Sequence, residues 1–366
     1  MKRLLLILTL FCLASTSWAE KISREQALRQ AQQFLGQNGK GAALTIAETS
    51  MSKARRRGQQ VSDYYYVFNA GQNQGYVVVS GDDRTAPILG YSEHGNFDVD
   101  KIPCNMAAWL QGYADQIKYI QEHPEAQVTR GDVQTHADVA SLLTTTWGQA
   151  EPYNNLLPSF GGRKCVTGCG ATAMAQIMNY YGAPASSPAI PGYTTTKHGI
   201  VCDALPATTF NWTNMGSNHE VAKLMQYCAY ALKADFDPDG TSAFDNMIVN
   251  ALTGYFGYGN GVQEAYHSTY AEADWDMLIY NEIANSRPVI LIGQSPTAGG
   301  HFFILHGYKV SGGVGYYTVN WGWDGIEDGN FLLSAMDPPS VGAGFNDNQA
   351  VIVGISPSDV TPYQVE

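Results

Sequence analysis

The chain has 366 residues, which is enough for about two domains. Hydrophobic residues make up 45%, so full cores are possible, and the 38 glycines and 22 tyrosines favour a protein rich in strands and turns. The formal net charge is −12, with 33 acidic against 21 basic side chains. This balance argues against nucleic acid or an anionic membrane as a partner, because both require basic patches.

The N-terminus resembles a secretory signal peptide at residues 1–19. Lys2 and Arg3 give it a charged start, residues 4–14 an apolar run, and residues 17–19 a small-x-small cleavage site. No later segment of the sequence reaches the length of a membrane span. We therefore expect an exported protein that is not embedded in a membrane.

Export normally encourages disulfides, but the cysteine count does not describe a disulfide scaffold. Of the 6 cysteines in the chain, Cys12 lies in the signal segment, and the odd number that remains leaves at least one thiol unpaired. A bond between Cys165 and Cys169 is possible, because the two are close in sequence. The sequence leaves open whether Cys165 forms a disulfide.

Residues 20–130 are expected to form a first α+β unit. Ser23, with a glutamine three residues later, resembles a capping box that opens a helix. Two strand runs at 64–68 and 76–80 are joined by a turn-prone segment, and a closing helix spans about 109–120.

A polar linker follows, at residues 122–138, where the apolar pattern is lost. We place the domain boundary there and assign residues 131–366 to the second unit. The bond between Arg130 and Gly131 is a plausible cleavage site, because no strong structure is predicted around it.

The second unit places its helices before its strands. Such an order, with links of hairpin length, is typical of an α+β fold with an antiparallel sheet. Helices are expected around 169–181, 221–232 and 275–283, and strands at 288–292, 301–305, 316–321, 330–333 and 350–355.

Cys169 stands where a loop of small residues runs into a helix that stops at Gly182. The free N–H groups at a helix N-terminus carry partial positive charge and lower the pKa of a thiol from about 8.5 to roughly 3.5–7.5. Cys169 is therefore a candidate nucleophile, although most cysteines are small core residues. The helix is predicted to bury one apolar stripe, made of Met174, Ile177, Met178 and Tyr181.

A thiol nucleophile needs a base, and His301 is the best placed histidine. It follows two glycines that would let a substrate backbone approach, and it opens an apolar strand. His306 lies at an odd offset on the same strand, so it should face the other side of the sheet. That offset disfavours a zinc site made of Cys165, Cys169 and both histidines, and we expect no metal.

Three further residues have side chains that could assist catalysis by a thiol and an imidazole. The Asn320 amide can hold the second imidazole nitrogen, and Trp321 can shield that hydrogen bond from water. The Gln149 amide, together with the Cys169 backbone N–H, can stabilise a developing oxyanion. Each residue alone is equally typical of a structural role, so the interpretation depends on their combination.

The order Gln149, Cys169, His301, Asn320 resembles the papain-like arrangement, and within it the streptopain family of secreted bacterial cysteine proteases. The second unit is similar to that family from about residue 140 to 355, and the first unit resembles the family's inhibitory propeptide. The stretches that carry the resemblance are 146–154, 167–178, 299–303 and 319–323, with 75–83 in the propeptide.

The resemblance implies a papain-like protease domain, with a helical part and an antiparallel sheet or barrel part, preceded by an α+β propeptide. It implies that Cys169 is the nucleophile, that His301 is the general acid/base and that Gln149 is the oxyanion donor. Asn320 and Trp321 would orient the histidine.

Further expectations concern what the site binds. The resemblance places substrate contacts at Ser242 and Gly300, requires no cofactor, and implies protein or peptide substrates. The propeptide, at 20–127, is expected to fold alone and to cover the cleft between Cys169 and His301.

Two other functions are compatible with parts of the sequence. An amidase or transglutaminase-like acyl transferase would keep the thiol–imidazole chemistry and change the acceptor. A secreted inhibitor or binding protein without catalysis would use only the propeptide-like unit. The complete set of four motif residues favours a secreted endopeptidase made as a zymogen.

Overall fold

The computed structural model describes residues 21–39, 43–47, 63–124, 135–244, 246–295, 299–335 and 349–358. The predicted signal peptide at 1–19 and the predicted cleavage site at Arg130-Gly131 lie outside these residues. Among the described helices, none is both long enough and apolar enough to cross a lipid bilayer.

The N-terminal part begins with a helix that is capped as predicted. The Ser23 hydroxyl accepts from the Gln26 N–H, and the Gln26 side chain accepts from the Ser23 N–H, which completes the capping box. The described elements here are α1 (Arg24–Gln37), β1 (Leu44–Ile46), β2 (Tyr65–Ala70), β3 (Tyr76–Ser80), β4 (Ile88–Ser92) and α3 (Cys104–Glu122).

Helix α3 begins several residues before the predicted start. Pro103 is its N-cap residue, and Cys104 and Asn105 form its first turn. Proline suits the start of a helix, since it has no N–H to leave unpaired. The early start matters because this turn reaches the site described below.

The C-terminal part follows the predicted order of helices and then strands. Its helices are α4 (Cys169–Tyr181), α5 (Asn218–Ala231), α6 (Asn246–Gly254) and α7 (Glu272–Ala284). Its main strands are β11 (Gln263–Tyr266), β12 (Val289–Ser295), β13 (Gly299–Ser311), β14 (Val314–Asn320), β15 (Gly329–Phe331) and β16 (Ala350–Val353). Short strands and 3-10 turns lie in the loops: β5 (Ser159–Phe160), β6 (Arg163–Lys164), β7 (Ser186–Ser187), β8 (Tyr193–Thr194), β9 (Val201–Cys202), β10 (Thr208–Thr209), η1 (Trp212–Asn214) and η2 (His267–Thr269).

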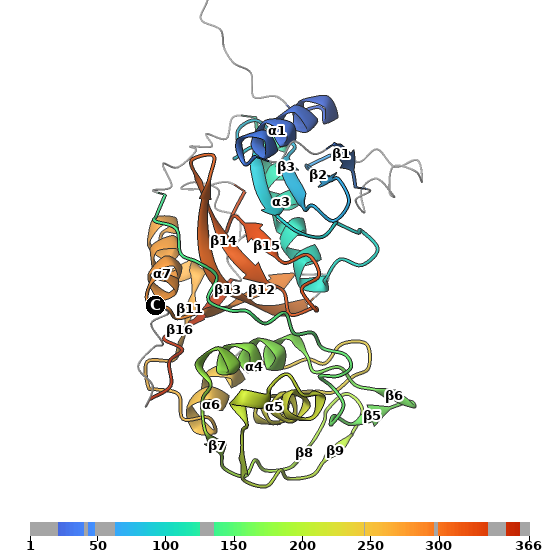
Figure 1. The fold of residues 1–366 in the computed structure, drawn as a ribbon, viewed down its shortest axis with the longest axis vertical. Helices are drawn as coiled ribbons and strands as arrows, with labels where there is room; N and C mark the ends of the chain where they lie inside the picture. Colours follow the sequence, from blue (N-terminus) through green and yellow to red (C-terminus); the bar gives the residue numbers. More distant parts are fainter. Residues whose placement is uncertain are drawn as a thin grey trace, which may run out of the picture.

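One antiparallel sheet runs through both parts of the chain, as Figure 1 shows. Its strand order is β1-β2-β3-β4-β15-β14-β13-β12-β16-β11, so the two parts join where β4 pairs with β15. The register at this junction places Tyr91 opposite Asn330 and Gly90 opposite Phe331. The α+β fold with an antiparallel sheet is therefore confirmed, and the sheet also crosses the predicted domain boundary.

The two parts also share a hydrophobic core. Leu89 and Trp109 from the N-terminal part belong to the same buried cluster as Phe303, Trp321 and Phe331 from the C-terminal part. Removing either part would expose apolar surface of the other, at a cost of about 25 cal/mol per Å². The shared core joins the two parts in this state, and independent folding of residues 20–127 stays a prediction.

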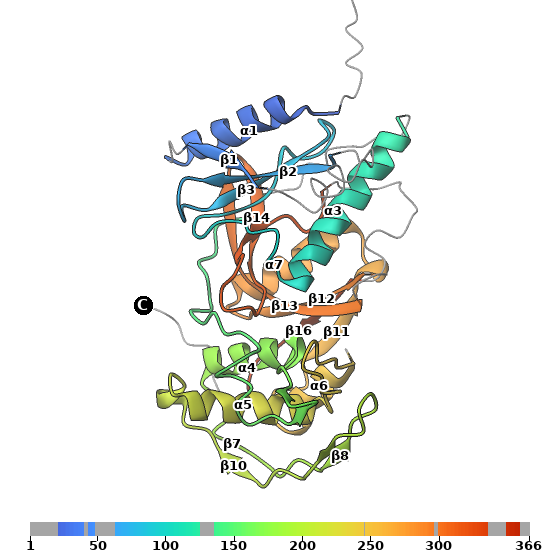
Figure 2. The same cartoon turned by 90° about the vertical axis from the view of Figure 1, so that its right-hand side faces the viewer.

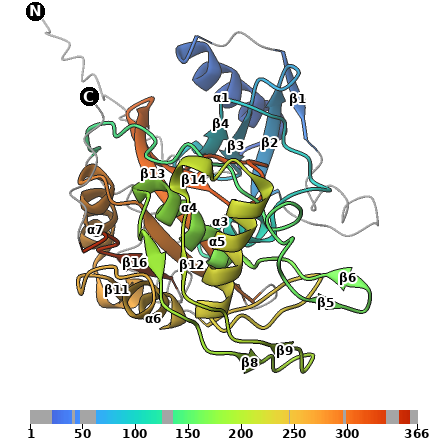
Figure 3. The ribbon, with the colours of Figure 1, turned by 60° about the horizontal axis from the view of Figure 1, so that its bottom comes forward.

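Helices cover both faces of the C-terminal sheet. Helices α3 and α7 pack on one face, and α4 lies between the opposite face and α5 (Figures 2 and 3). Because β12 and β13 are covered on both sides, their residues are almost continuously apolar. The N-terminal turns of α3 and α4 thus approach β13 from opposite sides of the sheet.

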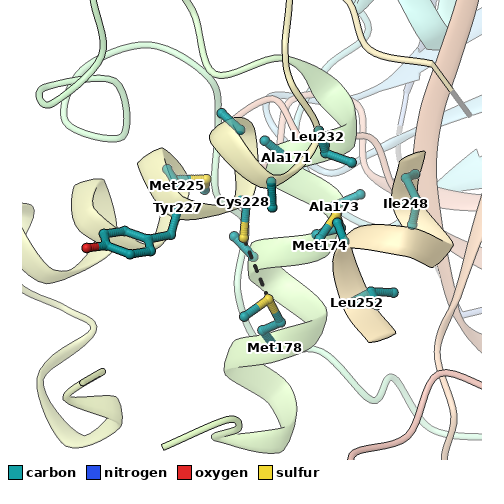
Figure 4. Packing of buried hydrophobic residues seen from close by; sticks show 14 of the residues in the cluster. Ala171, Ala173, Met174, Met178, Met225, Tyr227, Cys228, Leu232, Ile248 and Leu252 are labelled. Atoms are coloured by element: carbon teal, nitrogen blue, oxygen red, sulfur yellow. Dashed lines mark hydrogen bonds between the residues drawn. The ribbon is translucent and has the colours of Figure 1, made fainter. Parts of the chain in front are cut away.

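Helix α4 is buried more completely than its predicted stripe indicates. Its residues from Gly170 to Met178 are all buried, whereas Tyr181 is only partly buried. Alanines in this stretch allow α5 and α6 to approach closely, and the Cys228 thiol of α5 points at the Met178 sulfur, 3.6 Å away (Figure 4). Gly182 ends the helix in the left-handed conformation, as predicted.

Candidate active site

Cys169 is the first residue of α4, and the loop before it requires a glycine. Gly168 has a φ of 85°, in the left-handed region that favours glycine. A Cβ at this position would also meet the Thr241 backbone oxygen at 2.9 Å. The thiol is therefore held at the helix N-terminus by a tight turn that packs against the loop around residue 241.

The thiol of Cys169 is a neutral group in this state of the protein. Burial raises the pKa of Cys169 to about 11, and hydrogen bonds from the backbone N–H groups of Phe302 and of the helix start lower it by less. The sequence predicts a lowered pKa from the helix N-terminus. That prediction is wrong for this state, because desolvation of the sulfur outweighs the helix effect.

His301 lies near the start of β13, where it is buried and opposite Gly293 of β12. Its Nδ1 is 3.7 Å from the Sγ of Cys104, in the first turn of α3. The N-terminal part of the chain thus reaches the imidazole directly, as expected of a propeptide that covers the cleft.

His306 faces the other side of the sheet, as the strand offset predicts. Its Nδ1 accepts a hydrogen bond from the Leu143 N–H at 3.4 Å, on the side of the sheet that α4 covers. Burial lowers the pKa of His306 to about 4, so this imidazole is neutral at physiological pH. Within the described residues, no group of three or more His, Cys, Asp or Glu side chains is arranged to hold a metal ion.

Asn320 ends β14 and forms an amide pair with Gln176 of α4. The Asn320 Nδ2 donates to Gln176 Oε1 at 3.1 Å and to the Thr145 carbonyl at 2.8 Å, while its Oδ1 accepts from Gln176 Nε2 at 3.0 Å. Gln176 is fully buried and also accepts the Trp147 N–H at 3.0 Å. Sequence reasoning missed Gln176, although a glutamine in an apolar helix was a signal. The role of Asn320 in orienting His301 stays a prediction.

Trp321 is fully buried next to Asn320 and is fixed at both its ring and its backbone. Its indole N–H donates to the Glu327 carbonyl at 2.9 Å. The centroid of its ring lies 4.8 Å from the centroid of the Phe303 ring. Its carbonyl accepts a 2.7 Å hydrogen bond from the Asn105 amide of α3. Helix α3 therefore contacts Trp321, next to Asn320, as well as the His301 imidazole.

Gln149 is buried beside the loop that precedes Cys169. Its carbonyl accepts from the Thr167 N–H at 3.0 Å, which ties the two loops together just before Cys169. The predicted substrate residues both lie at the surface: Ser242 is exposed in its loop, and a Cβ on Gly300 would meet nothing within 4 Å. Open space at Gly300 is what a substrate backbone requires.

The described cysteines, which include every one after the signal segment, are all free thiols. Cys165 is buried, and burial raises its pKa, with smaller contributions from Asp237 and Cys202. The bond to Cys169 is not formed in this state.

Two neighbouring carboxyl groups, Glu327 and Asp328, lie where the N-terminal part of the chain covers Trp321. Glu327 accepts the Asp98 N–H at 3.0 Å through Oε1 and the Tyr76 hydroxyl at 2.8 Å through its carbonyl, and Asp328 accepts the Trp321 N–H at 2.9 Å. Burial raises the pKa of both carboxyls, to about 7 in each case. The pair is therefore partly protonated near neutral pH.

The fold is that of a papain-like cysteine peptidase with a propeptide domain in place. Comparison with known families agrees, since residues 147–331 match the model of the Peptidase C10 family and residues 19–117 that of the Spi protease inhibitor. The chain belongs to the Peptidase C10 family. The resemblance to streptopain-type proteases with an inhibitory propeptide is confirmed.

Similar proteins cover both parts of the chain. Streptopain of Streptococcus pyogenes is 30% identical over 353 residues, with 87% of each chain covered. The thiol protease/hemagglutinin PrtT of Porphyromonas gingivalis is 28% identical over 385 residues, which are 96% of this chain and 43% of that protein.

Solved structures of Prevotella intermedia interpain A are similar in fold. A fragment of prointerpain A is 27% identical with a TM-score of 0.70, covering 86% of this chain and 99% of the fragment. The active interpain A cysteine protease, at 27% identity and a TM-score of 0.51, covers 62% of this chain and 99% of its own. The similarity to the proenzyme thus extends over more of this chain than the similarity to the active enzyme.

Proposed function

We propose that the protein is a secreted zymogen of a cysteine endopeptidase, with a signal peptide at 1–19, an inhibitory propeptide at 20–130 and a protease domain at 131–366. The observation that carries the proposal is the first turn of α3 at the site, with the Cys104 sulfur 3.7 Å from His301 Nδ1. A substrate carbonyl cannot occupy that place while α3 is docked. The proenzyme is therefore inactive, and its propeptide has to leave.

Once the propeptide leaves, water and substrate reach the thiol and the desolvation that holds it neutral is relieved. His301 then takes the proton of Cys169, and the thiolate attacks the peptide carbonyl carbon. The Gln149 amide and the Cys169 N–H hold the oxyanion, with Asn320 and Trp321 orienting the imidazole. His301 returns the proton to the leaving amine, and water hydrolyses the thioester.

Substrates are proteins or peptides, which lie with their backbone along Gly300 and the loop of Ser242. The matured enzyme should cleave an internally quenched peptide at an internal bond without releasing ammonia from glutamine side chains. Measuring both products in one reaction tests the proposal against an amidase. Ammonia release without backbone cleavage would reject the endopeptidase.

The junction between β4 and β15 should control how firmly the propeptide is held. A Cβ at Gly90 would meet the Phe331 ring at 2.3 Å, and Phe331 is packed against Trp321. Because overpacking costs roughly 1–3 kcal/mol, Gly90→Ala should release the propeptide about 5- to 150-fold faster. The rate is measured by gel densitometry of the maturing proprotein in reductant.

Gly112→Ala provides the matched control for this substitution. Gly112 lies in α3, and a Cβ there would meet nothing within 4 Å. This variant should mature at the wild-type rate or more slowly, since alanine favours a helix. Equal rates for the two variants would show that the junction does not restrain the propeptide.

The carboxyl pair should make propeptide release depend on pH. The raised pKa values of Glu327 and Asp328 mean that the docked propeptide favours their protonated forms. Their contribution to docking is complete below their ordinary pKa values of 4.5 and 3.8 and is lost as the pH rises through about 7. Release should therefore accelerate from about pH 5 to 8.

The measurement divides the maturation rate by the hydrolysis rate of mature enzyme at each pH. The groups that face the pair are Tyr76 and Asp98 of the propeptide, and Asp98 also opposes ionisation of Glu327. The double variant Glu327→Gln, Asp328→Asn should show a flat ratio over this range. A wild-type ratio that is equally flat would contradict the prediction.

A further inference from the structure

Two thiols from different parts of the chain lie beside the same dipeptide of β13. Cys104, at the start of α3, has its sulfur 3.7 Å from His301 Nδ1. Cys169 is the first residue of α4, and the residue after it, Gly170, packs against the Phe302 ring, where an added Cβ would meet the ring at 3.4 Å. The dipeptide His301-Phe302 therefore lies between the two cysteine-bearing helix starts.

The neighbours of Cys104 hold its sulfur in this place. Pro103 before it is buried, and the Asn105 amide after it donates to the Trp321 carbonyl at 2.7 Å. Cys104 itself remains exposed. Helix α3 thus brings the Cys104 sulfur to His301, the residue next to Phe302 in β13. Peptide hydrolysis uses one thiol, so the proposed function gives the Cys104 thiol no chemical role beyond occupying the site.

We propose that Cys104 is a redox modification site, where oxidation forms a disulfide with Cys169 and locks the propeptide covalently onto the nucleophile. The inference rests on the proposed function, in which Cys169 has to be a free thiol for catalysis. A disulfide requires Cα atoms within about 7 Å of each other, so the bond forms only while α3 is docked on β13.

The oxidant is a low-molecular-weight disulfide, RSSR. The exposed Cys104 thiol gives its proton to His301, and its thiolate attacks one sulfur of RSSR, forming a mixed disulfide and releasing RS⁻. The Cys169 sulfur, after losing its proton, then attacks the Cys104 sulfur and displaces the second RS⁻. Both protons end on the released thiolates, so two protein thiols are oxidised and RSSR is reduced to two RSH.

The disulfide between Cys104 and Cys169 would persist after proteolytic cleavage of the linker at residues 122–138. A propeptide attached through Cys104 stays on the active site even when its chain is no longer continuous with the protease domain. Only a reductant then frees Cys169, so cleavage and reduction are both required for activity. The lock protects the proenzyme in oxidising surroundings and opens in reducing ones.

The test treats freshly prepared proprotein with oxidised glutathione at graded ratios to reduced glutathione. The wild type should give a peptide pair joined through Cys104 and Cys169 in unreduced digests, with the loss of two hydrogens. Its maturation in the same buffers should stop at about tenfold less oxidant than that of Cys104→Ser, because the second thiol is already in place. Dithiothreitol should restore both proteins.

Cys165→Ser is the matched control, since it removes the thiol closest in sequence to the nucleophile and should leave the cross-link intact. The proposal is overturned if the wild type carries only glutathione adducts, or if it and Cys104→Ser lose maturation at the same oxidant ratio. A cross-linked protein that, once reduced, cleaves no peptide would instead reject the endopeptidase function and leave the disulfide standing.

Discussion

Replacing Cys169 by alanine should lower peptide hydrolysis by at least about 10⁴-fold. Cys169 is the first residue of α4, and the Phe302 N–H lies near its sulfur. No other described cysteine has both features. Without the sulfur no thioester forms, and the remaining oxyanion donors stabilise only the attack of water. The variant should accumulate as full-length protein minus the signal segment, which intact-mass spectrometry of the secreted product measures.

Cys104→Ser is the control for this substitution under reducing conditions. It removes an exposed thiol that also lies at the imidazole, so a general effect of losing a sulfur near His301 would show here as well. In dithiothreitol this variant should mature and then hydrolyse peptide at the wild-type rate. Full activity in folded Cys169→Ala protein would reject Cys169 as the nucleophile.

Local sequence patterns were enough to predict several elements of the structure. The capping box at Ser23 and the helix stop at Gly182 depend on neighbours three or four residues away, and both are present. The separation of His301 from His306 follows from the alternation of a strand, which holds in β13 up to a bulge between Leu305 and Gly307. Such features are predictable because the interaction and the pattern lie in the same segment.

The junction between the two parts was not predictable in this way. Pairing of β4 with β15 joins residues more than two hundred positions apart, and neither strand carries a local sequence pattern that predicts which strand it pairs with. The same holds for the amide pair of Gln176 and Asn320 and for the approach of Cys104 to His301. A polar residue within an apolar helix was the available signal for Gln176.

The prediction of a lowered pKa for Cys169 was wrong for a different reason. A helix N-terminus lowers the pKa of a thiol that water can still reach. The sequence predicts the helix, but it does not predict how far the sulfur is exposed to solvent. In the proenzyme, burial of the sulfur dominates and the pKa is about 11. The direction of a pKa shift therefore describes a state of the protein, here the one with its propeptide docked.

Replacing His301 by alanine should also lower peptide hydrolysis by at least about 10⁴-fold, because in the proposed mechanism the imidazole both removes the thiol proton and protonates the leaving amine. The variant keeps its thiol, so it should still be alkylated by iodoacetamide once the propeptide has been removed by an added protease. Alkylation should be slower than in the wild type at neutral pH and should depend on pH as an isolated thiol does. Turnover and alkylation rates, measured over the same pH range, give the two results.

His306→Ala separates catalysis from folding on the same strand. Its imidazole is buried and neutral on the other face of β13, and it accepts the Leu143 N–H. Its loss should cost roughly 1–3 kcal/mol of stability, because that N–H is left without its acceptor. The turnover number of the folded fraction should remain within about threefold of the wild type. Chemical denaturation and active-site titration distinguish the two variants, and a loss of turnover in His306→Ala equal to that in His301→Ala would show that the strand, rather than the His301 imidazole, carries the effect.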